Sequence, residues 1–93
     1  MIDRGARPRL AAKARLKLDR HSGQHMLLYP ERGMVLNAAA SAIVELCDGT
    51  CTVGEIVERL HAASAGASRD TVESDVHAFL DALRARGLLR SDE

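Results

Sequence analysis

The chain has 93 residues, of which 46% are hydrophobic and 28% are charged, with a formal net charge of zero. This length suits one domain with a single hydrophobic core, and the composition is that of an ordinary globular protein. No apolar run approaches the roughly 18 residues of a membrane-spanning helix and no export signal is present, so we expect a soluble, cytoplasmic protein with no membrane partner.

The zero net charge hides an uneven distribution along the chain. Residues 1–20 carry seven basic and two acidic side chains, whereas residues 21–93 carry six and eleven. Because residues 1–12 also lack a hydrophobic period, we expect them to form a flexible basic arm. The arm can contact an acidic partner or the acidic body of a second copy, or it can simply keep the chain soluble. The domain itself then spans residues 13–90, with residues 91–93 as a tail.

Three short segments after the arm have the character of strands. Residues 15–19 alternate polar and apolar side chains, and residues 25–29 and 34–36 are short apolar runs. Turn-forming residues at 21–24 and 30–33 separate them. This spacing predicts a three-stranded antiparallel meander at the N-terminal end of the domain.

From residue 37 onward the hydrophobic period changes from two to about 3.6, the period of a helix. Residues 38–47, 53–61 and 71–86 each carry one apolar stripe and predict three short helices. Each is preceded by a residue able to cap free backbone N–H groups: Asn37, Thr52 and Asp70. Residues 88–89 form an apolar tail or begin another short strand. The whole outline is α+β and resembles a winged helix-turn-helix.

Cys47, Cys51 and His61 are the strongest candidates for a metal site. A structural zinc ion needs four ligands, usually with Cys pairs two to four residues apart, and no fourth ligand is evident. Cys47 also lies on the apolar stripe of its helix, where a Cys usually behaves as a small hydrophobic residue. We therefore predict no metal ion, no other cofactor and a core position for Cys47.

No other group of residues suggests catalysis. The acidic residues do not pair for general acid–base chemistry, and the single glycines form no phosphate-binding loop. His21 and His25 fall on a turn or a polar face, whereas His77 lies beside the apolar stripe of the third helix, where it can line a groove. By elimination we predict a binding module with no catalytic residues, not an enzyme.

Five short motifs follow one another in the order and spacing of a known family. They are YPERGMVLN at residues 29–37, LCDG at 46–49, TVGEIV at 52–57, DV at 75–76 and RGLL at 86–89. Over about residues 9–89 they resemble the PqqD family, the small peptide-binding proteins of pyrroloquinoline quinone biosynthesis. The resemblance implies the same winged helix-turn-helix-like fold.

The resemblance also implies a function. It suggests a non-catalytic chaperone that binds the precursor peptide PqqA and presents it to the radical SAM enzyme PqqE. In relatives of this kind the leader peptide adds as a strand beside the third strand, in a groove closed by the third helix. An open strand edge suits this because its unpaired backbone groups bind a peptide without demanding particular side chains.

Carried over by position, the peptide-binding residues fall on the third strand and the third helix. The edge comprises Gly33, Met34, Val35, Leu36 and Asn37, the facing wall Asp75, Val76, Phe79 and Leu80, and the rim His77 and Arg84. Val76 and Leu80 are explained equally well as core residues, since a groove wall is also half core.

Three alternatives remain open. A DNA-binding winged helix is one, although the third helix carries more acidic than basic residues and only the arm would attract phosphates, so we predict no nucleic-acid partner. A leader-recognition element of another modified-peptide pathway is the second. A homodimer with exchanged N-terminal segments is also compatible with the small core and the basic arm.

Overall fold

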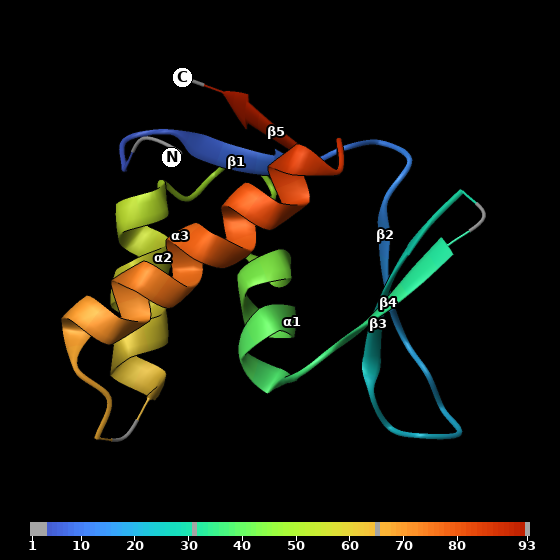
Figure 1. The fold of residues 1–93 in the computed structure, drawn as a ribbon, viewed down its shortest axis with the longest axis horizontal. Coiled ribbons are helices and arrows are strands. Elements are labelled where there is room, and N and C mark those ends of the chain that lie inside the picture. The colour runs from blue at the N-terminus through green and yellow to red at the C-terminus, as the bar shows by residue number, and fades with distance from the viewer. Residues whose placement is uncertain (1–3, 31, 65, 93) are drawn as a thin grey trace.

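A computed structural model describes residues 4–30, 32–64 and 66–92 of the chain (Figure 1). A three-stranded sheet lies on one side of the molecule and three helices lie on the other. A separate pair of strands joins the N-terminal and C-terminal ends of the chain. None of the helices in the described residues has the length and apolar character that a membrane crossing needs.

The sheet is the predicted meander. Its strands are β2 (Arg15–Leu18), β3 (His25–Tyr29) and β4 (Arg32–Leu36), antiparallel in the order β2-β3-β4. In the central row Leu16 lies opposite Leu27, and Leu27 lies opposite Met34. Leu27 has no exposed surface, so this row faces the core. The α+β, winged-helix-like fold class is therefore confirmed.

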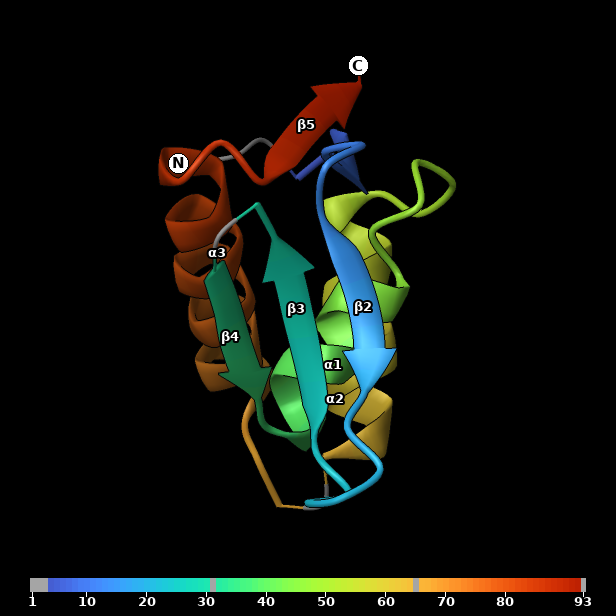
Figure 2. The same cartoon turned by 90° about the vertical axis from the view of Figure 1, so that its right-hand side faces the viewer.

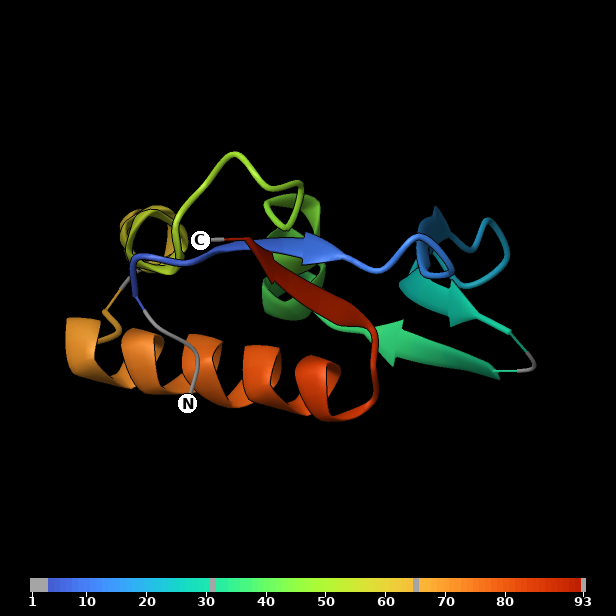
Figure 3. The same cartoon turned by 90° about the horizontal axis from the view of Figure 1, so that it is seen from above.

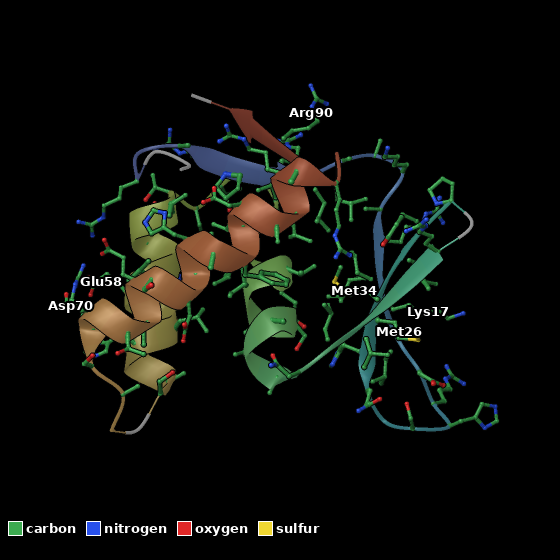
Figure 4. The ribbon with its side chains drawn as sticks, viewed as in Figure 1. Lys17, Met26, Met34, Glu58, Asp70 and Arg90 are labelled. Carbon is green, nitrogen blue, oxygen red and sulfur yellow. The ribbon has the colours of Figure 1, made fainter. Side chains whose placement is uncertain are left out.

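The two faces of the sheet differ because successive side chains of a strand point to opposite sides. Figure 4 shows Met34 directed toward α1 (Ala38–Glu45), whereas Met26 and Lys17 point away from the helices. Figure 2 shows the sheet in front of α1 and α2 (Val53–Ala63), with β4 as the strand nearest to α3 (Arg69–Ala85). This arrangement leaves β4 at the edge of the sheet that faces α3.

Side-chain caps define where the helices begin. The Asn37 side chain accepts a hydrogen bond from the Ala40 backbone N–H at 2.7 Å. Thr52 and Glu55 form the predicted capping box at the start of α2. The cap of α3 is Ser68, not Asp70 as the sequence predicted, because the helix begins two residues earlier.

The N-terminal segment differs from the expected flexible arm. Arg7–Leu10 form strand β1, which pairs antiparallel with β5 (Leu89–Asp92). Ala6 and Pro8 are buried while Arg7 and Arg9 are exposed, so the segment has the alternation of a half-buried strand. The expectation of an unstructured arm over residues 1–12 does not hold for β1, and the expected tail contributes residues 91–92 to β5. Residues 1–3 and Glu93 lie outside the described residues.

Backbone hydrogen bonds hold this segment against the loop between α1 and α2. The Leu10 N–H donates to the Cys47 carbonyl at 3.0 Å, and the Gly49 N–H donates to the Pro8 carbonyl at 3.0 Å. Gly49 has φ +84°, and a Cβ there would lie 2.6 Å from the Arg9 guanidinium. This segment is thus an integral part of the domain, and Figure 3 shows β1 beside β5.

The same segment also caps α2. The first N–H groups of a helix have no partner within the helix. Here the Val53 N–H donates to the Ala6 carbonyl at 2.9 Å, and the Gly54 N–H donates to the Arg4 carbonyl at 3.0 Å. On its other side Arg4 pairs with Glu73 of α3 at 3.5 Å. These contacts join α2 and α3 through a segment that is remote from both in sequence.

Candidate functional site

The three-stranded sheet has two outer strands, β2 and β4, and the free edge of β4 is the one that lies beside α3. β4 is an outer strand of its sheet, and in the described residues its five residues make no backbone hydrogen bonds other than those to β3. Proteins usually protect an exposed strand edge against pairing with another chain by covering it, twisting it away or placing charged residues on it. An open edge can instead accept a further extended chain, which would complete the hydrogen-bond ladder.

Two hollows mark the ends of this edge, and both lie between the sheet side and α3. One is lined at the start of β4 by Tyr29, Pro30, Arg32 and Arg86. The other is lined at its end by Asn37, Ala39, Ala40, Ile43, Asp75 and Phe79. We call residues 32–37 together with these two hollows the edge strip. The strip runs antiparallel to α3, because Arg32 meets the C-terminal end of the helix.

The structure brings most of the expected β4 residues to the strip. Val35 is 57% exposed and Gly33 is also exposed, whereas Met34 is half-buried on the face toward the helices. Leu36 is buried, so its side chain is not part of the exposed edge. Asn37 lines the second hollow, although its side-chain oxygen already accepts the N-cap hydrogen bond of α1.

The expected α3 residues divide into three groups. Asp75 and Phe79 line the second hollow beside Asn37. Val76 and Leu80 are 1% and 0% exposed, so they support that surface from within the core and are not part of it. The remaining two, His77 and Arg84, lie on another flank of the helix.

His77 is buried on the side of α3 that faces away from the edge strip. It is 5% exposed and lines a different hollow, with Asp70, Glu73, Ser74, Ala78 and Asp81. Its Nε2 lies 4.0 Å from a Glu73 oxygen. Arg84 lies two helical turns after His77 and shares its flank. The structure therefore does not bring His77 and Arg84 to the hollow that Asp75 and Phe79 line.

Several residues that line the strip were not predicted from the sequence. Ala39, Ala40 and Ile43 of α1 line the second hollow. Arg32 and Arg86 line the first. Arg32 comes directly before the predicted edge strand, which was a usable signal. The juxtaposition of Arg86 with β4 had no local signal, because it depends on how α3 packs.

The titratable groups with shifted pKa values lie away from the strip. Burial raises the pKa of the Cys47 thiol to about 12, so it stays protonated and non-nucleophilic at neutral pH. Hydrogen bonds from the Thr50 side chain and backbone lower the pKa of Asp48. In the described part of the chain no three His, Cys, Asp or Glu side chains are placed to hold a metal ion. Cys47 and Cys51 are free thiols in the core.

The fold and the strip together define a class of protein. The chain is a small winged-helix-like domain with an open strand edge beside a helix. Residues 24–89 match the family described as Coenzyme PQQ synthesis protein D (PqqD). The chain therefore belongs to the PqqD family.

Relatives in two bacteria extend this match to nearly the whole chain. A protein of Rhodopseudomonas palustris named PqqA binding protein is 38% identical over 88 residues, which cover 95% of this chain and 85% of the relative. A protein of Xanthomonas axonopodis pv. citri with the same name is 38% identical over 89 residues, covering 96% of each. The resemblance inferred from the five motifs is confirmed.

Two solved structures share the fold. One is the solution structure of the PqqD part of Methylobacterium extorquens PqqCD, described as a stand-alone recognition element for ribosomally synthesised and post-translationally modified peptides. It has a TM-score of 0.74 and 34% identity, covering 89% of this chain and 87% of that one. The other is TbiB1 in complex with the TbiA(beta) leader peptide, with a TM-score of 0.74 and 26% identity, covering 88% and 94%.

Proposed function

We propose that this chain is a non-catalytic peptide chaperone of pyrroloquinoline quinone biosynthesis. It binds the precursor peptide PqqA and presents it to the radical SAM enzyme PqqE. The names of the two bacterial relatives and the description of the Methylobacterium structure support the peptide-binding part. The observation on this chain that carries the proposal is the open edge of β4 beside α3.

Binding proceeds by strand addition. An extended segment of the peptide pairs with β4 and becomes the fourth strand of the sheet. Backbone hydrogen bonds supply affinity that depends little on side chains, while the flanking hollows select among peptides. The proposed site comprises residues 33–37 with Asp75 and Phe79, and Val76 and Leu80 hold α3 in position behind it.

The chemistry on the peptide then belongs to the enzyme that receives it. A chaperone needs to bind, hold and release the peptide but not to transform it. The one thiol with a shifted pKa, Cys47, is buried and protonated, and the edge strip offers no pair of residues suited to general acid–base work. These features support a role in recognition and presentation.

The structure gives little support to the DNA-binding alternative. That alternative relied on a free basic arm to hold a phosphate backbone. Instead, Arg4 pairs with Glu73, and the Arg9 guanidinium lies against Gly49. The exposed side of α3 also carries Asp70 and Asp75, which would repel phosphates.

An amide NMR titration tests strand addition directly. The ¹⁵N-labelled chain is titrated with a synthetic PqqA peptide of Rhodopseudomonas palustris. We expect saturable shifts concentrated at residues 32–43, 75 and 79. The absence of shifts at saturating peptide, or shifts confined to the flank around His77, would contradict the proposal.

Two backbone-methylated peptides provide a matched control. Alternate N–H groups of a strand point to the same side, so only one alternate set can pair with β4. N-methylation of that set should abolish binding, whereas N-methylation of the other set should leave most of it. Equal effects of the two peptides would argue against a strand at the edge, even if the peptide binds.

A further inference from the structure

Strand addition at β4 leaves one question open, which is how the peptide finds its register. Backbone pairing alone does not distinguish registers, and a shift of one residue turns every side chain to the other face. β4 offers little help in its middle, since Gly33 has no side chain and Val35 is an exposed aliphatic residue. Register must therefore come from the two ends of the edge strip.

The dimensions of β4 and α3 match along the strip. Five residue steps of a strand from Arg32 to Asn37 span about 17 Å. Eleven residue steps of a helix from Asp75 to Arg86 span about 16 Å. This agreement explains why Arg86 meets Arg32 at one end while Asp75 meets Asn37 at the other. At one end of an added strand β4 and α3 thus present Arg32 and Arg86, and at the other end they present Asn37 and Asp75.

The two ends carry opposite charge. Arg32 and Arg86 line the first hollow with the aromatic ring of Tyr29. Asp75 lines the second hollow with the aromatic ring of Phe79. Neither guanidinium nor the Asp75 carboxylate makes an ion pair with any residue that the structure describes, where the ion pairs found are Arg4–Glu73, Arg69–Glu58 and a His77–Glu73 contact. These three charges are consequently available to a ligand.

Paired guanidinium groups are well suited to a carboxylate. Each presents a planar fork of N–H donors that matches two carboxylate oxygens, and Lys cannot reproduce this geometry. Arg86 lies at the C-terminal cap of α3 and Arg32 at the first residue of β4, so both side chains project from ordered backbone. A single carboxylate in the first hollow would contact both.

We propose that Arg32 and Arg86 form a carboxylate subsite for the bound peptide, and that Asp75 binds a cationic side chain about four or six residues away along it, because only an even spacing turns both side chains toward α3. The inference rests on the proposed function, because it concerns the same edge. It adds the chemistry of the recognised segment, an extended stretch with an acidic and a basic residue separated by about the length of β4. The two charges fix the register that the backbone leaves undetermined.

The test is a charge exchange between protein and peptide. Fluorescein-labelled PqqA of Rhodopseudomonas palustris is compared by anisotropy with a panel in which each acidic residue in turn is replaced by Lys. Against the unsubstituted chain, one member of the panel should bind about tenfold more weakly than the parent. Against Arg86→Glu, the parent should weaken by about the same factor, and that one member should bind better than the parent.

A matched variant separates this local effect from general electrostatics. Arg59→Glu makes the same charge change at an exposed position of α2, away from the strip. It should bind every peptide as the unsubstituted chain does, and amide NMR spectra should show that both variants are folded. Asp75→Lys provides the reciprocal test, with restored binding for a peptide whose basic residue is replaced by Glu.

Two outcomes would overturn the carboxylate subsite, and only one of them would also overturn the proposed function. Equal weakening by Arg86→Glu and Arg59→Glu, or the absence of any peptide with reversed preference, would overturn the carboxylate subsite while leaving peptide binding in place. Failure of the parent peptide to bind the unsubstituted chain would overturn the proposed function, and the subsite with it.

Discussion

The two small sheets of this protein are built alike, but the rest of the chain covers the edges of β1 and leaves one edge of β4 open. Both consist of short antiparallel strands. β1 is paired with β5 on one side and hydrogen-bonded to the loop at Cys47 and Gly49 on the other, so both of its edges are used. In the described residues β4 is paired on one side alone. The covered strand thus serves the fold, whereas the open strand is the one at which we propose that the peptide binds.

The two sheets also differ in how far apart their strands lie in the sequence. β1 and β5 join residues 7–10 to residues 89–92, whereas β3 and β4 are separated by a short turn. Closing the long loop costs conformational entropy that is repaid only when the whole domain packs. We therefore expect changes at the covered sheet to affect stability, and changes at the open edge to affect binding.

Removal of residues 1–10 should have the largest effect. It deletes β1 and the buried side chains of Ala6 and Pro8, and it leaves the Cys47 carbonyl and the first N–H groups of α2 without partners. Each buried group without a partner costs about 1–3 kcal/mol, a large share of the 5–15 kcal/mol that stabilises a typical domain. We expect the cooperative thermal transition, measured by circular dichroism, to be lost or lowered by more than about 10 °C. An unchanged transition would restore the interpretation of a flexible arm.

Val35→Pro should have the second-largest effect, and it should reduce peptide binding at the open edge of β4. Proline has no N–H group and fixes φ, so it disturbs an edge strand that must pair with a peptide. We expect the affinity for a PqqA peptide to fall at least about tenfold, measured by anisotropy, while circular dichroism still shows a folded domain. Val35→Thr, which keeps the backbone and the β-branched shape, is the control and should bind within about threefold of the original chain. Equal affinity of a folded Val35→Pro variant would exclude β4 as the pairing edge.

Thr52→Ala should have a smaller effect, again on the covered side. It removes the hydroxyl that accepts the Glu55 N–H at 3.1 Å and should lower stability by about 1 kcal/mol at neutral pH. Hydrogen bonds to Thr52 lower the pKa of Glu55, so the stabilising effect of that carboxylate is complete at neutral pH and is lost as the pH falls through its lowered pKa. Thr52→Ala keeps the backbone N–H that donates to the Glu55 carboxylate but removes the side-chain hydrogen bond that also lowers its pKa, so the melting-temperature difference between the two chains should shrink in acid. A difference independent of pH would show that the Thr52 side chain does not act on the Glu55 carboxylate.

The smallest expected effect concerns the two buried thiols, which should not react with an alkylating reagent in the folded chain. Cys47 and Cys51 lie in the core beneath the covered strand, and burial keeps the Cys47 thiol protonated. Iodoacetamide at neutral pH should leave both thiols unmodified in the folded chain, as judged by intact mass. Both should react when the chain is unfolded in guanidinium chloride. Rapid labelling of the folded chain would mean that the covered side opens readily.

Features that depend on neighbouring residues were predictable from the sequence. The meander, the three helices, and the caps at Asn37 and Thr52 follow from hydrophobic period and from side chains that bond to nearby N–H groups. The five motifs were sufficient to place the chain in its family. The start of α3 was predicted less well, because Ser68 and Asp70 are both suitable caps and their order along the chain does not decide between them.

Features that depend on packing were not predictable. β1 escaped notice because its partner lies at the other end of the chain and because Arg and Pro obscure its alternation. His77 was placed at the rim of the groove, yet the rotation of α3 buries it on the opposite flank. The sequence identifies Arg86 as part of a family motif and not as a site residue, although it lines one hollow with Arg32 at the start of β4.

The sequence by itself thus determined the identity and order of the local elements and the family to which they belong. Periodicity, turns and caps act over a few residues, so they can be recognised without knowing the fold. The tertiary structure alone decided which strand edge is covered, which stays open, and which charges stand at its two ends. Those properties arise where segments distant in sequence pack together, and no local pattern encodes the meeting of Arg32 with Arg86 or of Asn37 with Asp75.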